Sequence, residues 1–140
     1  MSGPAWSPDA RAIAFSDARR LQVGSVGDGA TRTLVEAPAG SALGGTAWFT
    51  GIAWSPDGRR IVYLQRETPA KPGSRSEIWL VPAAGGAPRR VAQAPASHPV
   101  LSDVDWHRGG TKIFTTGSTG EGQMQAHYQH WVMEGFLPVP

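Results

Sequence analysis

The stretch Gly51–Leu64, GIAWSPDGRRIVYL, reads as a strand, a tight turn and a second strand. Its turn residues are Ser55, Pro56, Asp57 and Gly58. Pro fixes φ at the first central position of a turn, Asp accepts a hydrogen bond from nearby backbone, and Gly tolerates a positive φ. Residues 52–55 and 61–65 are therefore predicted to pair as an antiparallel hairpin.

The same pattern occurs twice more, as PAWSPDARAIAF from Pro4 and as VDWHRGGTKIF from Val104. In every copy a Trp is followed seven residues later by an Ile; the pairs are Trp6 and Ile13, Trp54 and Ile61, Trp106 and Ile113. The Trp residues lie 48 and 52 residues apart. A period of this size indicates a repeat architecture.

The second copy continues into a longer unit. Residues 77–81, EIWLV, are predicted to form a third strand, and residues 89–93 a fourth after the small-residue turn at 83–86. Four sequential antiparallel strands in about 45 residues are the unit of a β-propeller blade. The first copy fits the same plan with strands at 12–16, 21–26 and 31–35, although Ala10 replaces the turn glycine.

The third copy is incomplete. Its strands are predicted at 111–116 and 128–134, and its first strand ends at Trp106. Its fourth strand is missing or reduced to FLPVP, whose prolines suit a sheet edge at best. The sequence thus predicts an all-β, partial propeller of about three four-stranded antiparallel blades, the last incomplete; blade 1 covers about 4–37, blade 2 about 50–95 and blade 3 about 101–140.

Composition agrees with this fold class and excludes others. The 140 residues include 18 Gly and 12 Pro, which suits short strands joined by turns, and they include no Cys for a disulfide framework. No apolar run approaches the roughly 20 residues that span a bilayer, and the first residues lack a secretory signal pattern. The net charge of +2 comes from scattered arginine pairs, so we expect no nucleic-acid partner.

The segment WSPDGRRIVYL, followed by EIWLVPAAGGAPRRV, resembles the TolB-type β-propeller repeat, a relative of the WD repeat. The resemblance implies a periplasmic or extracytoplasmic parent protein; the compartment of this chain stays unknown. It implies either a partner-binding propeller such as TolB or the propeller in front of the hydrolase domain of a prolyl-oligopeptidase-like serine peptidase. It implies no catalytic residue within the repeat, and we expect no cofactor.

Propellers normally contain four to eight blades, which is more than this sequence provides. Three interpretations stay open. The chain is a fragment, which we favour because residue 4 already lies inside a blade; or two copies complete a ring through their open blade faces; or the sequence is a degenerate gene piece.

The connections between strands are unequal, and this predicts where binding occurs. Residues 37–51, 66–76 and 117–126 form long connections that emerge on one face, whereas short turns share the other face. Long loops on a rigid scaffold are common binding sites. Trp48 and Phe49 are predicted either to anchor a partner or to fill space between blades.

Three cations lie on the neighbouring loop. Arg66, Lys71 and Arg75 are predicted to complement an acidic partner, the alternative being solvated loop charges. The residues that recur in the repeat are assigned to structure instead, because once-per-unit residues usually pack between units or shape turns; they are Trp6, Trp54, Trp106, Asp9, Asp57, Gly58 and Gly110.

Patterns typical of catalysis or metal binding fail. The sequence contains no G-x-S-x-G motif, and GSTG at 117–120 lacks the lysine of a phosphate loop. His127 and His130 would face opposite sides of a strand, so no shared metal is expected, and Asp103 with Asp105 forms no supported acid–base pair.

We therefore expect a non-catalytic scaffold for a protein or peptide partner. The alternative is the gating propeller of a serine peptidase, and a hydrolase domain encoded beyond Pro140 would distinguish it.

Overall fold

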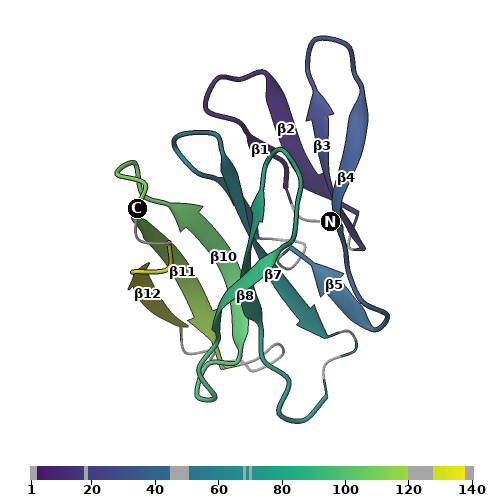
Figure 1. Ribbon diagram of the computed structural model, residues 1–140. Helices are drawn as coiled ribbons and strands as arrows, with labels where there is room; N and C mark the ends of the chain where they lie inside the picture. Colours follow the sequence, from purple (N-terminus) through teal and green to yellow (C-terminus); the bar gives the residue numbers. More distant parts are fainter. Residues whose placement is uncertain are drawn as a thin grey trace.

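The computed structural model describes residues 3–17, 19–44, 51–67, 69, 71–119 and 128–137. These residues form antiparallel sheets and no helix, so no membrane-crossing helix is found among them. Figure 1 shows the sheets side by side in chain order. The prediction of an all-β, partial propeller is confirmed.

Each sheet is one blade. Blade 1 contains β1 (Ala5–Trp6), β2 (Ala12–Ser16), β3 (Arg20–Ser25) and β4 (Thr31–Glu36) in sequential order. Blade 2 contains β5 (Ser41–Leu43), β6 (Ile52–Trp54), β7 (Arg60–Glu67), β8 (Glu77–Pro82) and β9 (Arg89–Gln93). Blade 3 contains β10 (Val100–Trp106), β11 (Lys112–Ser118) and β12 (Tyr128–Glu134).

The Trp–Ile spacing of the sequence is the register of the first hairpin in each blade. Trp6 lies directly opposite Ile13, Trp54 opposite Ile61, and Trp106 opposite Ile113. Directly opposed residues share one face of a sheet. We call the face that carries this pair the Trp face of the blade.

The turn of the second hairpin is held by its own side chains. The Ser55 hydroxyl donates to the Asp57 carboxylate at 2.6 Å, and the same carboxylate accepts the Arg59 backbone N–H at 3.0 Å. Ser55 Oγ also accepts the backbone N–H of Arg60. In the first hairpin, Ser7 and Asp9 make the equivalent bonds.

The third hairpin has the same kind of turn, but a histidine side chain replaces the Ser and Asp side chains that hold the other two. Its first turn residue is His107, whose Nδ1 accepts the backbone N–H of Gly109 at 3.0 Å. Gly110 has a φ of 79°, close to the 71° of Gly58. Ala10 occupies the same position with a φ of 59°, the left-handed conformation that costs a side-chain-bearing residue about 1–2 kcal/mol.

The connection predicted at 37–51 is not all loop. β5 pairs with β7 over Ser41–Leu43, in line with β6, which pairs with the other half of β7. Gly44 donates its N–H to the Leu64 carbonyl at 2.7 Å, and Leu64 donates its N–H to Gly51 at 2.9 Å. The first strand of blade 2 is thus divided in two, which period-based assignment missed because only the Trp half carries the repeat motif.

Two apolar clusters separate the three sheets. The first lies between blades 1 and 2 and includes Leu21, Ile61 and Tyr63; the second lies between blades 2 and 3 and includes Leu64 and Ile113. Successive residues of β7 alternate between the clusters, as a strand buried on both faces requires. Blade 2 is the middle layer, and the Trp faces of blades 2 and 3 each pack on the blade before them.

Blade 3 has three strands among the described residues. After β12 the chain turns at Gly135, with a φ of 70°, and places Phe136 against Trp106 at a ring separation of 5.5 Å. The Phe136 carbonyl accepts a 2.6 Å bond from Arg89 of blade 2. These contacts direct the chain toward the space between the blades, so residues 135–137 do not extend the sheet.

Candidate functional site: a cationic pocket on the long-loop face

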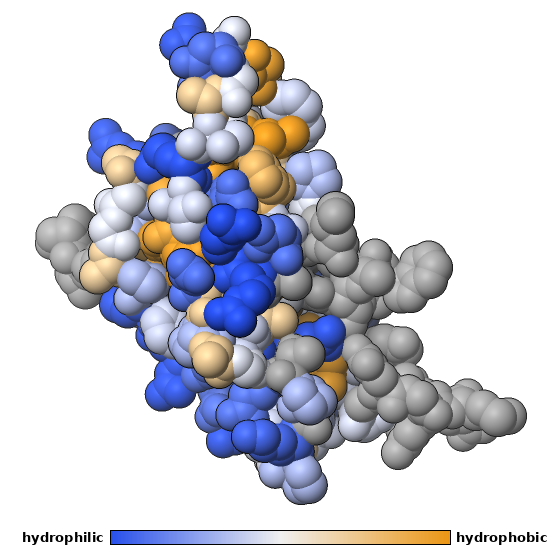
Figure 2. All heavy atoms as spheres, turned by 90° about the vertical axis from the view of Figure 1, so that its right-hand side faces the viewer, coloured by the Kyte–Doolittle hydropathy of each residue, from blue (hydrophilic) through white to orange (hydrophobic). Residues whose placement is uncertain are grey.

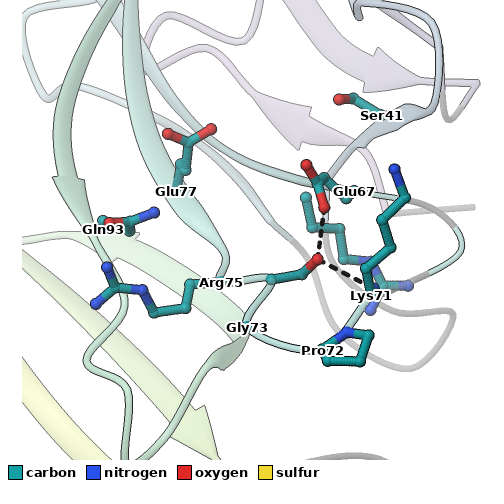
Figure 3. Close-up of a pocket in the computed structure, with 10 residues that line it drawn as sticks. Ser41, Glu67, Lys71, Pro72, Gly73, Arg75, Glu77 and Gln93 are labelled. Carbon is teal, nitrogen blue, oxygen red and sulfur yellow. Dashed lines mark hydrogen bonds between the residues drawn. The ribbon is translucent and has the colours of Figure 1, made fainter.

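The β2–β3 and β7–β8 connections lie at one end of blades 1 and 2, opposite the β1–β2 and β6–β7 turns (Figure 1). At this end of blade 2, the end of β7 and the 71–75 loop border a pocket of about 430 Å³ (Figure 3). The side chains around it come from β5, β7, β8, β9 and the 71–75 loop; they are Ser41, Arg66, Glu67, Lys71, Pro72, Gly73, Ser74, Arg75, Glu77 and Gln93.

Ser74 organises the loop side of this pocket. Its hydroxyl donates to the Glu67 carboxylate and accepts the Lys71 backbone N–H at 3.0 Å, as the dashed lines of Figure 3 show. The Lys71 carbonyl accepts the Ser74 backbone N–H at 2.9 Å. The loop is therefore closed on itself, and this closure fixes the backbone from which Lys71 projects.

The opposite wall is fixed by blade 2. The Glu77 carboxylate forms an ion pair with Arg90 at 2.7 Å, and the Arg75 guanidinium donates to the Ala94 carbonyl at 3.3 Å. Both carboxylates of the pocket thus accept a hydrogen bond or ion pair from a neighbouring side chain. The lining contains three cationic side chains, Arg66, Lys71 and Arg75, against these two carboxylates, which is a small excess of positive charge.

The structure brings together the three cations that the loop pattern singled out, because all three line this one pocket. Trp48 and Phe49 lie outside the described residues. Glu67, Ser74 and Gln93 were missed by the sequence reasoning. The Ser74–Glu67 contact joins residues seven apart in an irregular loop, for which no period exists, and Gln93 arrives from a strand that pairs with β8.

The three repeat tryptophans differ in environment. Trp106 is 7% exposed, and the Trp54 indole Nε1 donates to the Ala5 carbonyl of blade 1 at 2.9 Å. Trp6 is 57% exposed, since no described sheet precedes blade 1. The turn residues Asp9, Asp57, Gly58 and Gly110 lie at the other end of the blades from the pocket.

A second pocket of about 430 Å³ lies where β1, β6 and β10 meet. Trp6 and Trp54 line it together with Asp103 and Asp105, the two carboxylates that the sequence places on one face. Asp105 also accepts the backbone N–H of Trp106 at 2.8 Å. This pocket has an acidic wall, in contrast to the cationic pocket on the long-loop face.

The histidines do not form a metal site among the described residues. His130 lies on β12 with its ring stacked on Phe114 at 5.4 Å, and its Nδ1 is 2.9 Å from the Thr116 hydroxyl. His127 lies outside the described residues. No cluster of three metal-ligating side chains is found in the described part of the chain.

Known proteins of similar fold are found for nearly the whole chain. A protein of Agrobacterium tumefaciens assigned as a TolB shares 16% identity at a TM-score of 0.68, over 97% of this chain and 46% of its own. Dipeptidyl peptidase 4 of Porphyromonas gingivalis shares 12% identity at a TM-score of 0.70, over 97% and 24%. The chain therefore has the fold of a TolB-like β-propeller.

Among curated proteins, a Bacillus subtilis protein described as the uncharacterized peptidase YuxL is 24% identical over 99% of this chain. No family model matches the sequence. The chain spans only about a fifth of the YuxL length and less than half of the two solved structures. These likenesses establish the fold, and they include a TolB as well as proteins described as peptidases.

Proposed function

We propose that this chain is a non-catalytic binding scaffold that takes an acidic peptide segment of a protein partner into the cationic pocket on its long-loop face. One observation carries the proposal: Arg66, Lys71 and Arg75 line the same pocket, and both of its carboxylates are held by other donors. An incoming carboxylate would therefore meet cationic groups from the end of β7 and from the 71–75 loop.

The size and polarity of the pocket support a peptide side chain rather than a large apolar ligand. A volume of about 430 Å³ accommodates one or two side chains, and the amide of Gln93 and hydroxyl of Ser41 add hydrogen-bonding groups. Arginine is suited to this task because its planar guanidinium binds a carboxylate through two parallel hydrogen bonds. Electrostatic attraction would also make the affinity fall as salt increases.

The test is fluorescence anisotropy with a labelled peptide of alternating Glu and Ser, compared with the same peptide carrying Gln for Glu. We expect binding of the Glu peptide only. Arg66→Gln, Lys71→Gln and Arg75→Gln should each weaken it about twofold to fivefold, as exposed charge pairs do. The triple variant should abolish binding.

The matched control is Arg108→Gln, which removes an exposed arginine from the hairpin-turn end of blade 3. It should leave peptide affinity unchanged, and far-UV circular dichroism should show that all variants keep the fold. Equal losses for Arg108→Gln and Arg75→Gln would mean that only net charge matters, and the pocket would be rejected as the site.

The likeness to YuxL supports a second candidate, the propeller part of a peptidase. In that case the peptide would bind in the acidic pocket where β1, β6 and β10 meet, instead of at the long-loop face. A basic peptide whose binding is lost in Asp105→Asn but kept in Arg75→Gln would favour this candidate. Binding lost only in the loop-face variants would exclude it.

A further inference from the structure

The two outer sheets each leave one blade face without a neighbouring sheet among the described residues. Figure 2, which views the molecule from the side of blade 1, shows apolar surface among hydrophilic side chains in the upper part of the view. The large exposed apolar side chains of the described residues are few, namely Trp6, Val26, Phe114 and Val132. Three of these four lie on the two open faces, and Val26 lies in a turn.

The Trp face of blade 1 is built as an interface. Trp6 and Ile13 are directly opposed on it, and Gly24 lies beside them, since a Cβ at Gly24 would meet Ile13 and Phe15 side chains at 3.8 and 3.5 Å. The corresponding residues of blade 2 are Trp54 and Ile61, which pack on blade 1. The same surface that is buried in blades 2 and 3 is therefore presented to solvent in blade 1.

The open face of blade 3 has an apolar centre bordered by charges. Phe114 and Val132 are direct cross-strand partners and are 40% and 59% exposed. The Lys112–Glu134 ion pair, at 3.0 Å, lies beside them on the same face. By strand pairing these positions correspond to Val62 and Leu80 of blade 2, which are buried against the Trp face of blade 3.

We propose that two copies of this chain pair head to tail, with the Trp face of blade 1 in one copy packed on the open face of blade 3 in the other. The contact continues the packing already present twice within the chain, between blades 1 and 2 and between blades 2 and 3. A repeat protein stabilises each unit through its neighbours, so an added blade contact of the same kind is favourable.

The pairing closes on itself. Each copy offers one Trp face and one open blade 3 face, so two copies related by a two-fold axis form two identical contacts and leave neither face bare. The result has six blades, within the range of known propellers. Trp6 Nε1 would donate to the Asp105 backbone carbonyl, which corresponds to the Ala5 carbonyl that accepts from Trp54.

Light scattering on the purified chain over a concentration series is the first test. We expect a discrete species at twice 14.8 kDa. Trp6→Glu and Val132→Glu each place a carboxylate in both contacts of the pair and should weaken self-association about 30-fold or more, the effect of losing a hot-spot residue. Val26→Glu is the matched control, because Val26 is 54% exposed but lies off both faces, and it should leave the mass unchanged.

Mixing the two variants tests the orientation. Trp6→Glu keeps an intact blade 3 face and Val132→Glu keeps an intact Trp face, so the mixture regains one undamaged contact and should associate more strongly than either variant alone. A wild-type chain that is a folded monomer or a polydisperse aggregate would overturn the proposal. Full dimerisation of Val132→Glu would also overturn it, since the Trp faces would then pair with each other.

Circular dichroism distinguishes lost association from lost folding. Both substituted side chains are more than half exposed, so the variants should keep the β signal and cooperative melting of the monomer. If Trp6→Glu does not fold, Trp6→Ser tests the same contact without a charge. A folded Trp6→Ser that dimerises with unchanged affinity would count against the proposal.

Discussion

Blade 1 and blade 2 have the same hairpin register but different surroundings. Ile61 and Tyr63 of blade 2 are fully buried, whereas Ile13 and Phe15 at the matching positions are only partly buried. The difference arises because blade 2 has a sheet on both sides and blade 1 has one. The repeat motif therefore determines backbone pairing within a blade, and the neighbouring blade determines how much each side chain stabilises the fold.

The largest expected effect is a contrast between matched isoleucines. Ile61→Ala should lower the free energy of unfolding by about 2–5 kcal/mol, because it leaves a cavity between blades 1 and 2. Ile13→Ala should cost about 1 kcal/mol or less, since solvent already reaches that side chain. Urea unfolding followed by circular dichroism measures both losses. Equal losses would show that blade 1 is covered in solution.

A smaller contrast separates the tryptophans. Trp54→Phe removes the hydrogen bond to the Ala5 carbonyl and should cost about 1–2 kcal/mol, counting the lost bond and the smaller ring. Trp6→Phe should change the stability of the monomer little, because Trp6 is 57% exposed. The comparison is made by urea unfolding at a concentration where the chain is monomeric. A cost for Trp6→Phe at higher concentration only would reflect association.

The hairpin turns give a reciprocal pair of substitutions. Ala10→Gly should stabilise the chain by up to about 1 kcal/mol, since glycine adopts a positive φ without steric cost. Gly58→Ala should destabilise it by about 1 kcal/mol. A Cβ at Gly58 would meet Pro8 at an ordinary 3.8 Å, so the cost comes from backbone conformation alone. Thermal melts of both variants would test this; changes of the same sign would contradict it.

The smallest expected effect is a dependence of folding stability on pH that arises from the turn aspartates. The Ser55 hydroxyl, followed by the Arg59 backbone N–H, lowers the pKa of Asp57 below its usual 3.8, and Ser7 lowers the pKa of Asp9 likewise. A lowered folded-state pKa gives stability that is complete above the usual pKa and is lost as pH falls through the folded value. We expect stability to decline below about pH 4 from this cause.

Ser55→Ala distinguishes this cause from general acid unfolding. It keeps the Asp57 carboxylate but removes the largest contributor to its lowered pKa, so the acid-side decline should become shallower. Asp57→Asn should reduce the decline further. Urea midpoints measured from neutral to acid pH check both variants, and an unchanged slope in Asp57→Asn would rule out this turn as a source.

Much of the fold could be predicted from sequence because the repeat is local. The Trp–Ile spacing, the turn residues and the four-strand plan lie within short windows, and the third strand at 128–134 was predicted with its observed bounds. The divided first strand of blade 2 was missed, since Ser41–Leu43 is too short and carries no motif. The charges of the candidate pocket were predicted, but Ser41 and Gln93 of its lining come from β5 and β9, which only tertiary structure places beside the loop.

The divided first strand of blade 2 also determines where this blade can accept insertions. The Gly44 N–H and the Gly51 carbonyl bond to the same residue, Leu64, so the two points between which the strand is divided lie at a single rung of the ladder. Segments of different length can connect these two points without shifting the register of β7. The entropic cost of a longer segment grows only with the logarithm of its length. Blade 2 therefore contains a position where new residues can be added while both neighbouring cores stay intact.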